Sequence, residues 1–261
     1  MSGRLAAGVE VRSLRKEFGR FRVKALEEVS LSIAPGQFVS VLGQSGCGKS
    51  TLLRCIAGLE VPSSGSVSVN GTPVSAPPEG LGMVFQRDAL LDWRTVADNL
   101  LLPVDFRGGD RKAARQRGDQ LLGLTGLKGF ESYYPAQLSG GMRQRVALCR
   151  ALVDDPVLLL MDEPFGALDA LTRDQMNVEL QRMWLTEHKT VVFVTHSITE
   201  AIFLGDRVVV FTPRPGRVAE VIEIELPRPR RLAVRASEKF IGYASRIREL
   251  FEQMGLLKED A

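Results

Sequence analysis

The chain has few of the residues that build disulfide frameworks or metal clusters. It contains three cysteines, Cys47, Cys55 and Cys149, and two histidines, His188 and His196, in 261 residues. No two cysteines form a CxxC pair, and their number is odd. This usage predicts reduced thiols in a cytosolic chain rather than a disulfide scaffold or a zinc site.

Long apolar runs and a strong charge imbalance are lacking too. No segment approaches the ~18–20 apolar residues that span a bilayer, and the first ten residues lack the apolar core of a secretory signal. Lys+Arg number 34 and Asp+Glu 31, a net charge of +3, which favours no dedicated nucleic-acid binder. We expect neither a channel nor a permease, although the chain could dock onto one.

What the chain has in abundance is alternating strand and helix character. Hydrophobic residues make up 44% and charged residues 25%, which is ordinary globular composition. Four short apolar runs occur, at Gln37–Leu42, Val157–Met161, Thr190–Thr195 and Arg207–Phe211. Helical stretches separate the last three of them. Near-continuous apolar strands of this kind predict an α/β fold with a parallel sheet covered on both faces.

The segments around these runs differ in character. Val9–Arg12, Glu28–Ile33 and Ser66–Val69 predict an N-terminal antiparallel β subdomain, with a hairpin turn at Asn70-Gly71. Residues from about 90 to 152 predict a helical subdomain, and about 230 to 261 a helical tail after the arginine- and proline-rich passage Pro227–Arg231. The tail helix either packs on its own domain or binds a partner. We expect one domain over residues 1–261.

A glycine-rich loop follows the first apolar run. Gly43–Ser50 (GQSGCGKS) matches GxxxxGK[ST] between a strand and a helix. Its glycines let consecutive backbone N–H groups point at phosphate oxygens, and the helix N-terminus adds its dipole. Lys49 could reach the β- and γ-phosphates, and the Ser50 hydroxyl could ligate Mg²⁺. The glycine spacing GxxGxG does not fit the dinucleotide motif GxGxxG.

Two carboxylates end the run Val157–Met161. A buried strand would carry Asp162 and Glu163 to the C-terminal edge of the sheet, where ligands bind in open α/β folds. Asp162 would help to hold Mg²⁺, and Glu163 would orient and deprotonate an attacking water.

A second anion-binding helix start occurs at Ser139-Gly140-Gly141, within LSGGMRQR. One nucleotide does not need two such sites from one chain. A symmetric dimer would use both, with each nucleotide held between the phosphate loop of one subunit and the Ser-Gly-Gly helix of the other.

Together these motifs resemble the nucleotide-binding subunit of an ATP-binding cassette (ABC) transporter, over about Val9 to Arg217. The resemblance implies the P-loop NTPase cassette fold, and four further roles. Gln86 would touch Mg²⁺ and link the site to a membrane subunit, His196 would contact the γ-phosphate, and Gly166–Asp169 would cross the dimer interface. Phe18 would stack on adenine, with Phe21 as the rival.

The predicted site residues fall into three sets. The catalytic residues are Lys49, Gln86, Glu163 and His196. The nucleotide-binding residues are Phe18, Gly43, Gln44, Ser45, Gly46, Cys47, Gly48, Lys49, Ser50, Thr51, Ser139, Gly140, Gly141 and Asp169. The Mg²⁺ ligands are Ser50, Gln86 and Asp162.

The resemblance further implies a bacterial importer subunit, because the chain has a single cassette and no fused membrane domain. Lys49 and Ser139 stand 90 positions apart, which leaves no room for the long coil of DNA-end ATPases. The implied assembly is a cassette homodimer with ATP and Mg²⁺, on the cytoplasmic face of the inner membrane. It would contain integral-membrane permease subunits and an extracytoplasmic substrate-binding protein, and no nucleic acid.

Three stretches narrow the cargo class. Leu91–Val96 (LDWRTV), Thr195–Ala201 (THSITEA) and Arg214–Arg217 (RPGR) are similar to the nitrate/sulfonate/taurine group, with Asp92 where proline is usual. The alternatives are an importer of a thiamine or pyrimidine precursor, or a non-transport ABC ATPase that acts as a mechanical module.

Overall fold

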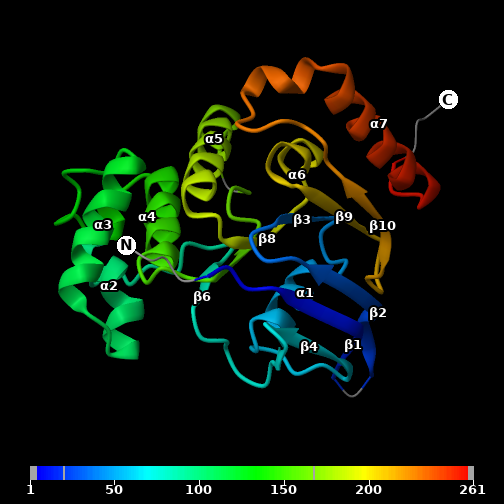
Figure 1. Cartoon of the computed structure of the whole chain (residues 1–261), viewed down its shortest axis with the longest axis horizontal. Coiled ribbons are helices and arrows are strands. Elements are labelled where there is room, and N and C mark those ends of the chain that lie inside the picture. The colour runs from blue at the N-terminus through cyan, green and yellow to red at the C-terminus, as the bar shows by residue number, and fades with distance from the viewer. Residues whose placement is uncertain (1–4, 20, 167, 258–261) are drawn as a thin grey trace.

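The computed structural model describes residues 5–19, 21–166 and 168–257, which contain two β-sheets and the helices around them (Figure 1). The four-stranded sheet has the antiparallel order β2-β1-β4-β5, and the six-stranded sheet the order β10-β9-β3-β8-β7-β6. In the latter, β9, β3, β8, β7 and β6 run parallel, and β10 pairs antiparallel with β9. This arrangement confirms the predicted α/β fold with a parallel core and an N-terminal antiparallel sheet.

The elements have these bounds. The strands are β1 (Val9–Phe18), β2 (Val23–Ile33), β3 (Phe38–Leu42), β4 (Ser64–Val69), β5 (Thr72–Pro73), β6 (Leu81–Val84), β7 (Leu158–Asp162), β8 (Thr190–Thr195), β9 (Arg207–Phe211) and β10 (Val218–Glu223). The α-helices are α1 (Lys49–Ile56), α2 (Val96–Arg107), α3 (Arg111–Leu124), α4 (Gly140–Leu152), α5 (Ala170–Glu187), α6 (Ile198–Leu204) and α7 (Glu238–Gln253). Two 3₁₀ helices, η1 (Pro135–Gln137) and η2 (Leu232–Ala236), complete the set described.

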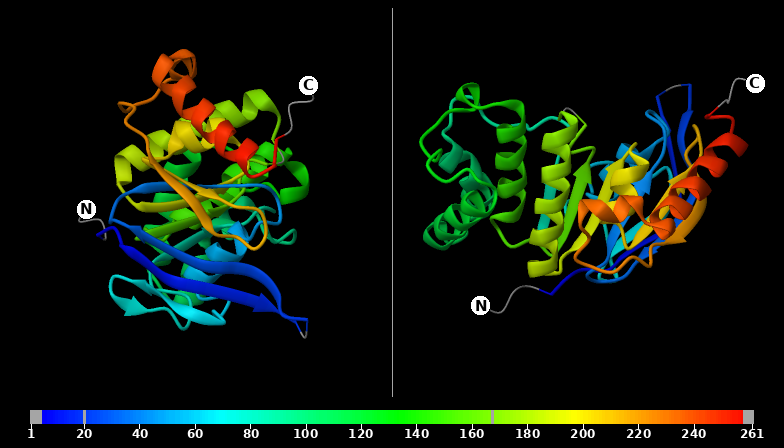
Figure 2. Two further views of the ribbon diagram at one scale, coloured as in Figure 1. Left: turned by 90° about the vertical axis from the view of Figure 1, so that its right-hand side faces the viewer. Right: turned by 90° about the horizontal axis from the view of Figure 1, so that it is seen from above.

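Strand alternation divides the parallel sheet between two hydrophobic cores. Val39 and Val41 of β3 face the core that contains α1 and the antiparallel sheet. Phe38 and Leu42 face the other core, beneath α5, α6 and α7. Because successive side chains of a strand point to opposite faces, a strand buried on both faces is apolar throughout. The sheet therefore has a covering layer on each side (Figure 2).

Helices α2, α3 and α4 pack against one another at the β6 end of the sheet (Figure 1). Asp110 begins α3 by accepting hydrogen bonds from Lys112 N and Ala113 N, and Thr95 begins α2 in the same way through Asp98 N. Within the described residues, no helix is both long enough and apolar enough to cross a membrane.

The strands differ from the sequence prediction in length and number. The predicted Val9–Arg12 extends to Phe18, and β2 begins at Val23 rather than Glu28, with register shifts where the two strands pair. Register shifts of this kind, where a strand bulges, interrupt the alternating pattern by which a strand is recognised in a sequence. The sequence predicts neither the four-residue edge strand β6 nor the outer strand β10.

The tail helix α7 packs on its own domain. Phe240, Ala244 and Ile247 belong to the core beneath it, and α7 contacts α6. The side chain of Ser237 begins the helix by accepting a hydrogen bond from Phe240 N. The structure therefore favours packing of this helix on its own domain over binding of a partner.

Arg230 anchors the segment that leads into α7. Its side chain is 2% exposed, and Nη1 donates to Ile202 O, Phe203 O and Gly205 O, the carbonyls at the end of α6. Gln181 of α5 bonds both the N–H and the C=O of Arg230. Burial lowers the pKa of Arg230 to about 10, so it remains a cation at neutral pH.

Replacing Arg230 with Met is expected to lower the free energy of unfolding by about 3 kcal/mol, because buried carbonyls lose their donors. Urea denaturation measures this change. The exposed neighbour Arg231, replaced by Met, is the matched control and should change stability by less than about 0.5 kcal/mol. Equal stability of the two variants would contradict an anchoring role for Arg230.

Candidate nucleotide-binding site

Four strands of the parallel sheet end at one edge. Leu42, the last residue of β3, pairs with Thr195 at the end of β8, and Asp162 at the end of β7 pairs with Val194. Val84 ends β6 beside Met161. The register therefore brings together the four segments that follow these strands, which carry the phosphate loop, Gln86, Glu163 and His196.

The phosphate loop wraps tightly around the Lys49 ammonium. Lys49 is 3% exposed, and its Nζ donates to Gly43 O at 2.8 Å and to Gln44 O at 3.0 Å. Gly48 has φ of +108°, and a Cβ at this position would lie 2.6 Å from Ala25 O. Because only glycine tolerates both this conformation and this approach, the residue before Lys49 is fixed by the fold.

Ser50 and Asp162 form the side-chain pair at the base of the loop. Ser50 Oγ donates to Asp162 Oδ1 over 2.8 Å. Asp162 is 7% exposed, and its burial raises the pKa of this carboxyl, while the Ser50 hydrogen bond opposes the shift. A hydroxyl and a carboxylate oxygen are the hard ligands that Mg²⁺ prefers, and Mg²⁺ usually keeps waters and phosphate oxygens as its remaining ligands.

These oxygen donors fit a Mg²⁺ ion that is also bound by phosphate and water, rather than a metal ion bound by protein ligands alone. No group of three or more His, Cys, Asp or Glu residues gathers as a metal site in the part of the chain that the structure describes. Ser50, Asp162 and the nearby amide of Gln86 could supply only part of a coordination shell. A nucleotide phosphate and water would have to complete it.

Glu163 lies between a lysine and a histidine. Its backbone has φ of +44°, a left-handed conformation that is uncommon outside glycine, and its N–H donates to Val194 O at 2.9 Å. Oε1 lies 3.5 Å from Lys49 Nζ, and Oε2 lies 2.9 Å from His196 Nδ1. This turn directs the carboxylate toward both Lys49 and His196, and backbone strain of this kind is typical of functional sites.

Lys49, Ser50 and Glu163 border a cavity of about 270 Å³, whereas Asp162 and His196 do not line it. Nine of the predicted site residues line it: Phe18, Ser45, Gly46, Gly48, Lys49, Ser50, Thr51, Gln86 and Glu163. Phe18 lies at its wall, whereas Phe21 does not line it and is 94% exposed. Gly43, Gln44 and Cys47 belong to the loop but do not line the cavity, and Cys47 is buried.

Arg214 also lines the cavity, although sequence reasoning did not place it in the site. It belongs to the RPGR stretch between β9 and β10, 164 positions after Ser50. In the sequence, this stretch is distinctive only for its similarity to one group of cassettes. Nothing in the local sequence indicates that this loop folds back to the phosphate loop.

Ser139, Gly140, Gly141 and Asp169 do not line this cavity. The exposed Ser139 begins α4, and its Oγ accepts a hydrogen bond from Met142 N. Asp169 begins α5 by accepting from Thr172 N, and a Cβ at Gly141 would lie 3.1 Å from Thr172 Cγ2. The two helix starts are therefore neighbours, and Ser139 and Asp169 are both exposed. Ala167, in the loop before Asp169, lies outside the described residues.

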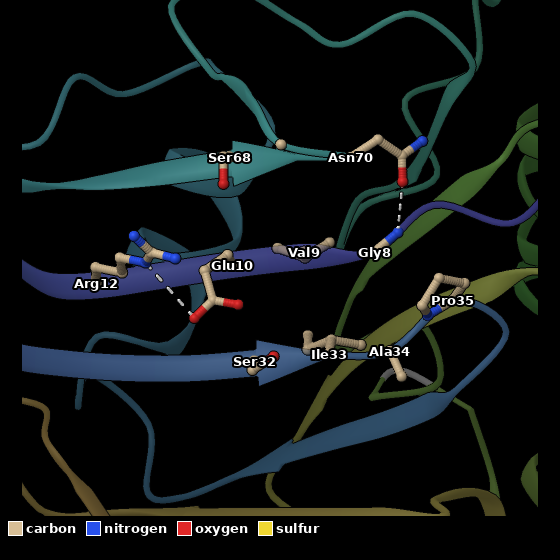
Figure 3. Close-up of a pocket in the computed structure, with 11 residues that line it drawn as sticks. Gly8, Val9, Glu10, Arg12, Ser32, Ile33, Ala34, Pro35, Ser68 and Asn70 are labelled. Carbon is tan, nitrogen blue, oxygen red and sulfur yellow. Dashed lines mark hydrogen bonds and ion pairs between the residues drawn. The ribbon is translucent and has the colours of Figure 1, made fainter.

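A second hollow, of about 330 Å³, lies on the antiparallel sheet (Figure 3). Arg12 pairs with Glu10 at 3.8 Å there, and Asn70 Oδ1 accepts from Gly8 N at 2.8 Å. None of the predicted site residues lines it. The first contact lies within β1 and the second joins Asn70 to the residue before β1, so these exposed polar groups bond one another, as expected of a solvated sheet face.

The cysteine in the phosphate loop is buried, which protects its thiol from reaction with solvent reagents. Cys47 is 2% exposed, and burial raises the pKa of its thiol. Burial also raises the pKa of Cys55 to about 11 and of Cys149 to about 12. Since the thiolate is the reactive form, all three thiols are expected to be unreactive at neutral pH.

Native chain at about pH 7.5 should therefore react with iodoacetamide at least about tenfold more slowly than free cysteine. The rate should rise as pH increases toward the raised pKa values. Mass spectrometry of the labelled chain measures it. In denaturant all three cysteines should label, and rapid native labelling of Cys47 would contradict this account.

The fold and this edge of the sheet define a class, the phosphate-loop nucleotide-binding α/β proteins. A family model described as "ABC transporter" matches residues 26–166. The chain is also 46% identical over 246 residues to an uncharacterised ABC transporter ATP-binding protein of Methanocaldococcus jannaschii, covering 94% of this chain and 91% of that protein. The chain belongs to the ABC transporter family, and it is an ATP-binding ATPase of that family.

Two further relatives carry functional names. The chain is 47% identical to a taurine import ATP-binding protein of Rhizobium johnstonii, covering 91% of this chain and 89% of that one. It is 40% identical to an aliphatic sulfonates import ATP-binding protein of Bacillus cereus, covering 90% and 92%. A solved ATP-binding cassette, a dimer in a post-hydrolysis state bound to ADP and Pi, is 32% identical with a TM-score of 0.72, covering 84% of this chain and all of that one. These matches confirm the resemblance drawn from the motifs.

Proposed function

We propose that this chain is the ATP-hydrolysing subunit of a membrane importer whose cargo is a small anion of the nitrate/sulfonate/taurine class. The observation that carries the proposal is the cluster of Lys49, Glu163 and His196 at one sheet edge, in a chain that is 47% identical to a taurine import ATP-binding protein. The site accounts for ATP hydrolysis, and the relatives' names support import and the cargo class.

The site residues divide the chemistry among them. Backbone N–H groups of the phosphate loop and the Lys49 ammonium bind the phosphate oxygens. Glu163 orients a water and takes its proton as the water oxygen bonds to the γ-phosphorus and the bond to the leaving ADP oxygen breaks. His196, hydrogen-bonded to Glu163, holds that carboxylate and faces the γ-phosphate. Phe18 stacks on adenine at the other wall.

Ser50, Gln86 and Asp162 would hold Mg²⁺, which when bound neutralises charge on the transferred phosphoryl group. The Ser50–Asp162 hydrogen bond preorganises two of these oxygens before nucleotide enters. Asp162 must be ionised to serve as a ligand, and its raised pKa makes this step sensitive to acid. Hydrolysis should accordingly decline as pH falls toward that pKa.

Two copies of the chain complete each site. Ser139, Gly140 and Gly141 of a second copy would bind the γ-phosphate with their helix N-terminus, and Asp169 would lie at the dimer interface. Support comes from the exposure of Ser139 outside the cavity and from the dimeric cassette that the chain resembles. The whole chain would act as one nucleotide-binding domain, with a helical subdomain over about 90–152 and a helical tail.

The remaining partners follow from import. The dimer would dock peripherally on integral-membrane permease subunits at the cytoplasmic face, through a surface near Gln86 and α2. An extracytoplasmic protein would deliver the cargo. ATP-driven closure would move the permease subunits, and hydrolysis would reopen the dimer.

Affinity purification of tagged Glu163→Gln chain from native membranes, with ATP and Mg²⁺, tests this proposal. We expect a multi-span membrane protein to co-purify, and the binding protein encoded with it to bind taurine, an alkanesulfonate or nitrate in calorimetry. The Lys49→Ala chain is the nucleotide-free control. Recovery of ribosomes, DNA or soluble proteins alone would overturn the transport proposal while leaving the ATPase intact, and binding of a pyrimidine would overturn the cargo class.

A further inference from the structure

The loop between β9 and β10 folds back onto the phosphate loop. Gly216 N donates to Ala25 O at 2.9 Å, and Glu27 N donates to Gly216 O at 3.0 Å. A Cβ at Gly216 would lie 2.2 Å from Cys47 O, so only glycine allows this approach. The loop is therefore fixed against β2 and the phosphate loop, rather than free in solvent.

This attachment sets the position of Arg214. Its Nε donates to Lys24 O at 3.1 Å, and the residue lines the nucleotide cavity together with Phe18 and Ala25. Lys24 of β2 pairs with Glu17 of β1, and the next pair along these strands is Val23 with Phe18. Arg214 therefore stands at the Phe18 end of the cavity, and Lys49 and Ser50 stand at the phosphate end.

The Arg214 guanidinium keeps two nitrogens for a ligand. Only Nε bonds to the protein, and no carboxylate pairs with this side chain among residues 5–19, 21–166 and 168–257. Its loop neighbour Arg217 differs, because Arg217 Nη2 pairs with Glu27 Oε2 at 2.5 Å. An arginine fixed at Nε and unpaired at its terminal nitrogens is a preorganised donor of hydrogen bonds.

We propose that Arg214 contacts the adenosine part of bound ATP, with its terminal N–H groups donating to ribose hydroxyl oxygens beside the ring of Phe18. This inference rests on the proposed nucleotide site and adds a residue to it. Arg214 would strengthen ATP and ADP binding alike, because both carry the same adenosine. It would contribute nothing to ligands that consist of phosphate alone.

Calorimetric titration of Arg214→Ala tests this. We expect the Kd of both ATP and ADP to rise about five- to tenfold, the scale of a partly exposed hydrogen bond from a charged donor. The Kd of inorganic tripolyphosphate should stay unchanged. Arg217→Ala, in the same loop but paired with Glu27, is the matched control, and its nucleotide affinity should remain within about twofold of wild type.

Two results would overturn the proposal. Arg214→Ala could bind ATP and ADP as tightly as wild type, or it could lose tripolyphosphate affinity by the same factor, which would mean that Arg214 acts through the phosphate loop. Equal urea midpoints for both variants exclude misfolding as the cause. If wild type bound no ATP, or Lys49→Ala bound it normally, the nucleotide site itself would fail, so the two failures are distinguishable.

Discussion

Replacing Glu163 with Gln is expected to lower kcat for ATP hydrolysis by about 10²–10⁴-fold, the usual effect of removing a general base. The amide keeps the size of the side chain and can still bond His196, but it cannot accept the proton of water. ATP affinity should stay within about threefold of wild type, because the phosphate loop is unchanged. Steady-state phosphate release and calorimetry measure the two quantities.

The exposed Glu225, replaced by Gln, is the matched control and should hydrolyse ATP at the wild-type rate. It lies in the segment after β10 and does not line the nucleotide cavity. Near-normal turnover of Glu163→Gln would show that a different group takes the proton. A large loss of ATP affinity in that variant would instead assign Glu163 to binding.

Replacing Lys49 with Ala is expected to weaken ATP binding on the order of 100-fold, because the phosphates lose a charged donor worth about 3 kcal/mol. The change also leaves Gly43 O and Gln44 O without their Lys49 donor and removes the cation 3.5 Å from Glu163. A fall in the urea midpoint should accompany the loss, so binding is measured at temperatures where the variant is fully folded.

The exposed Lys112 of α3, replaced by Ala, is the control for Lys49→Ala and should bind ATP normally. Unchanged ATP affinity in the Lys49 variant would remove the phosphate loop from the account. If the variant lost hydrolysis but kept its ATP affinity, Lys49 would stabilise only the transition state and not bound ATP.

The sequence predicts which segments come together where each motif directly follows a buried strand. Gly43–Ser50 and Asp162-Glu163 each follow a buried strand, so one rule about strand ends places them at the same edge. His196 follows β8 in the same way, but its partner Glu163 depends on the positive φ at that residue. No pattern in the sequence indicates that conformation.

Residues that act through distant contacts escape sequence analysis. Arg230 lies in a run of prolines and arginines with no local pattern that indicates burial, yet it is buried and donates to carbonyls at the end of α6. Arg214 reaches the cavity only because Gly216 packs on Cys47. The edge strand β6 is too short for its alternation to be distinguished from a loop.

The measurement that tests the central claim most directly is the mass of Glu163→Gln chain in solution, by light scattering with and without ATP and Mg²⁺. Each chain carries a phosphate loop and an exposed Ser139 helix start that does not line the same cavity, so ATP should join two chains. We expect the mass of one chain without ATP, of two chains with it, and of one chain for Glu163→Gln combined with Ser139→Phe. A single-chain mass at saturating ATP, or a dimer indifferent to both ATP and Ser139, would contradict the account.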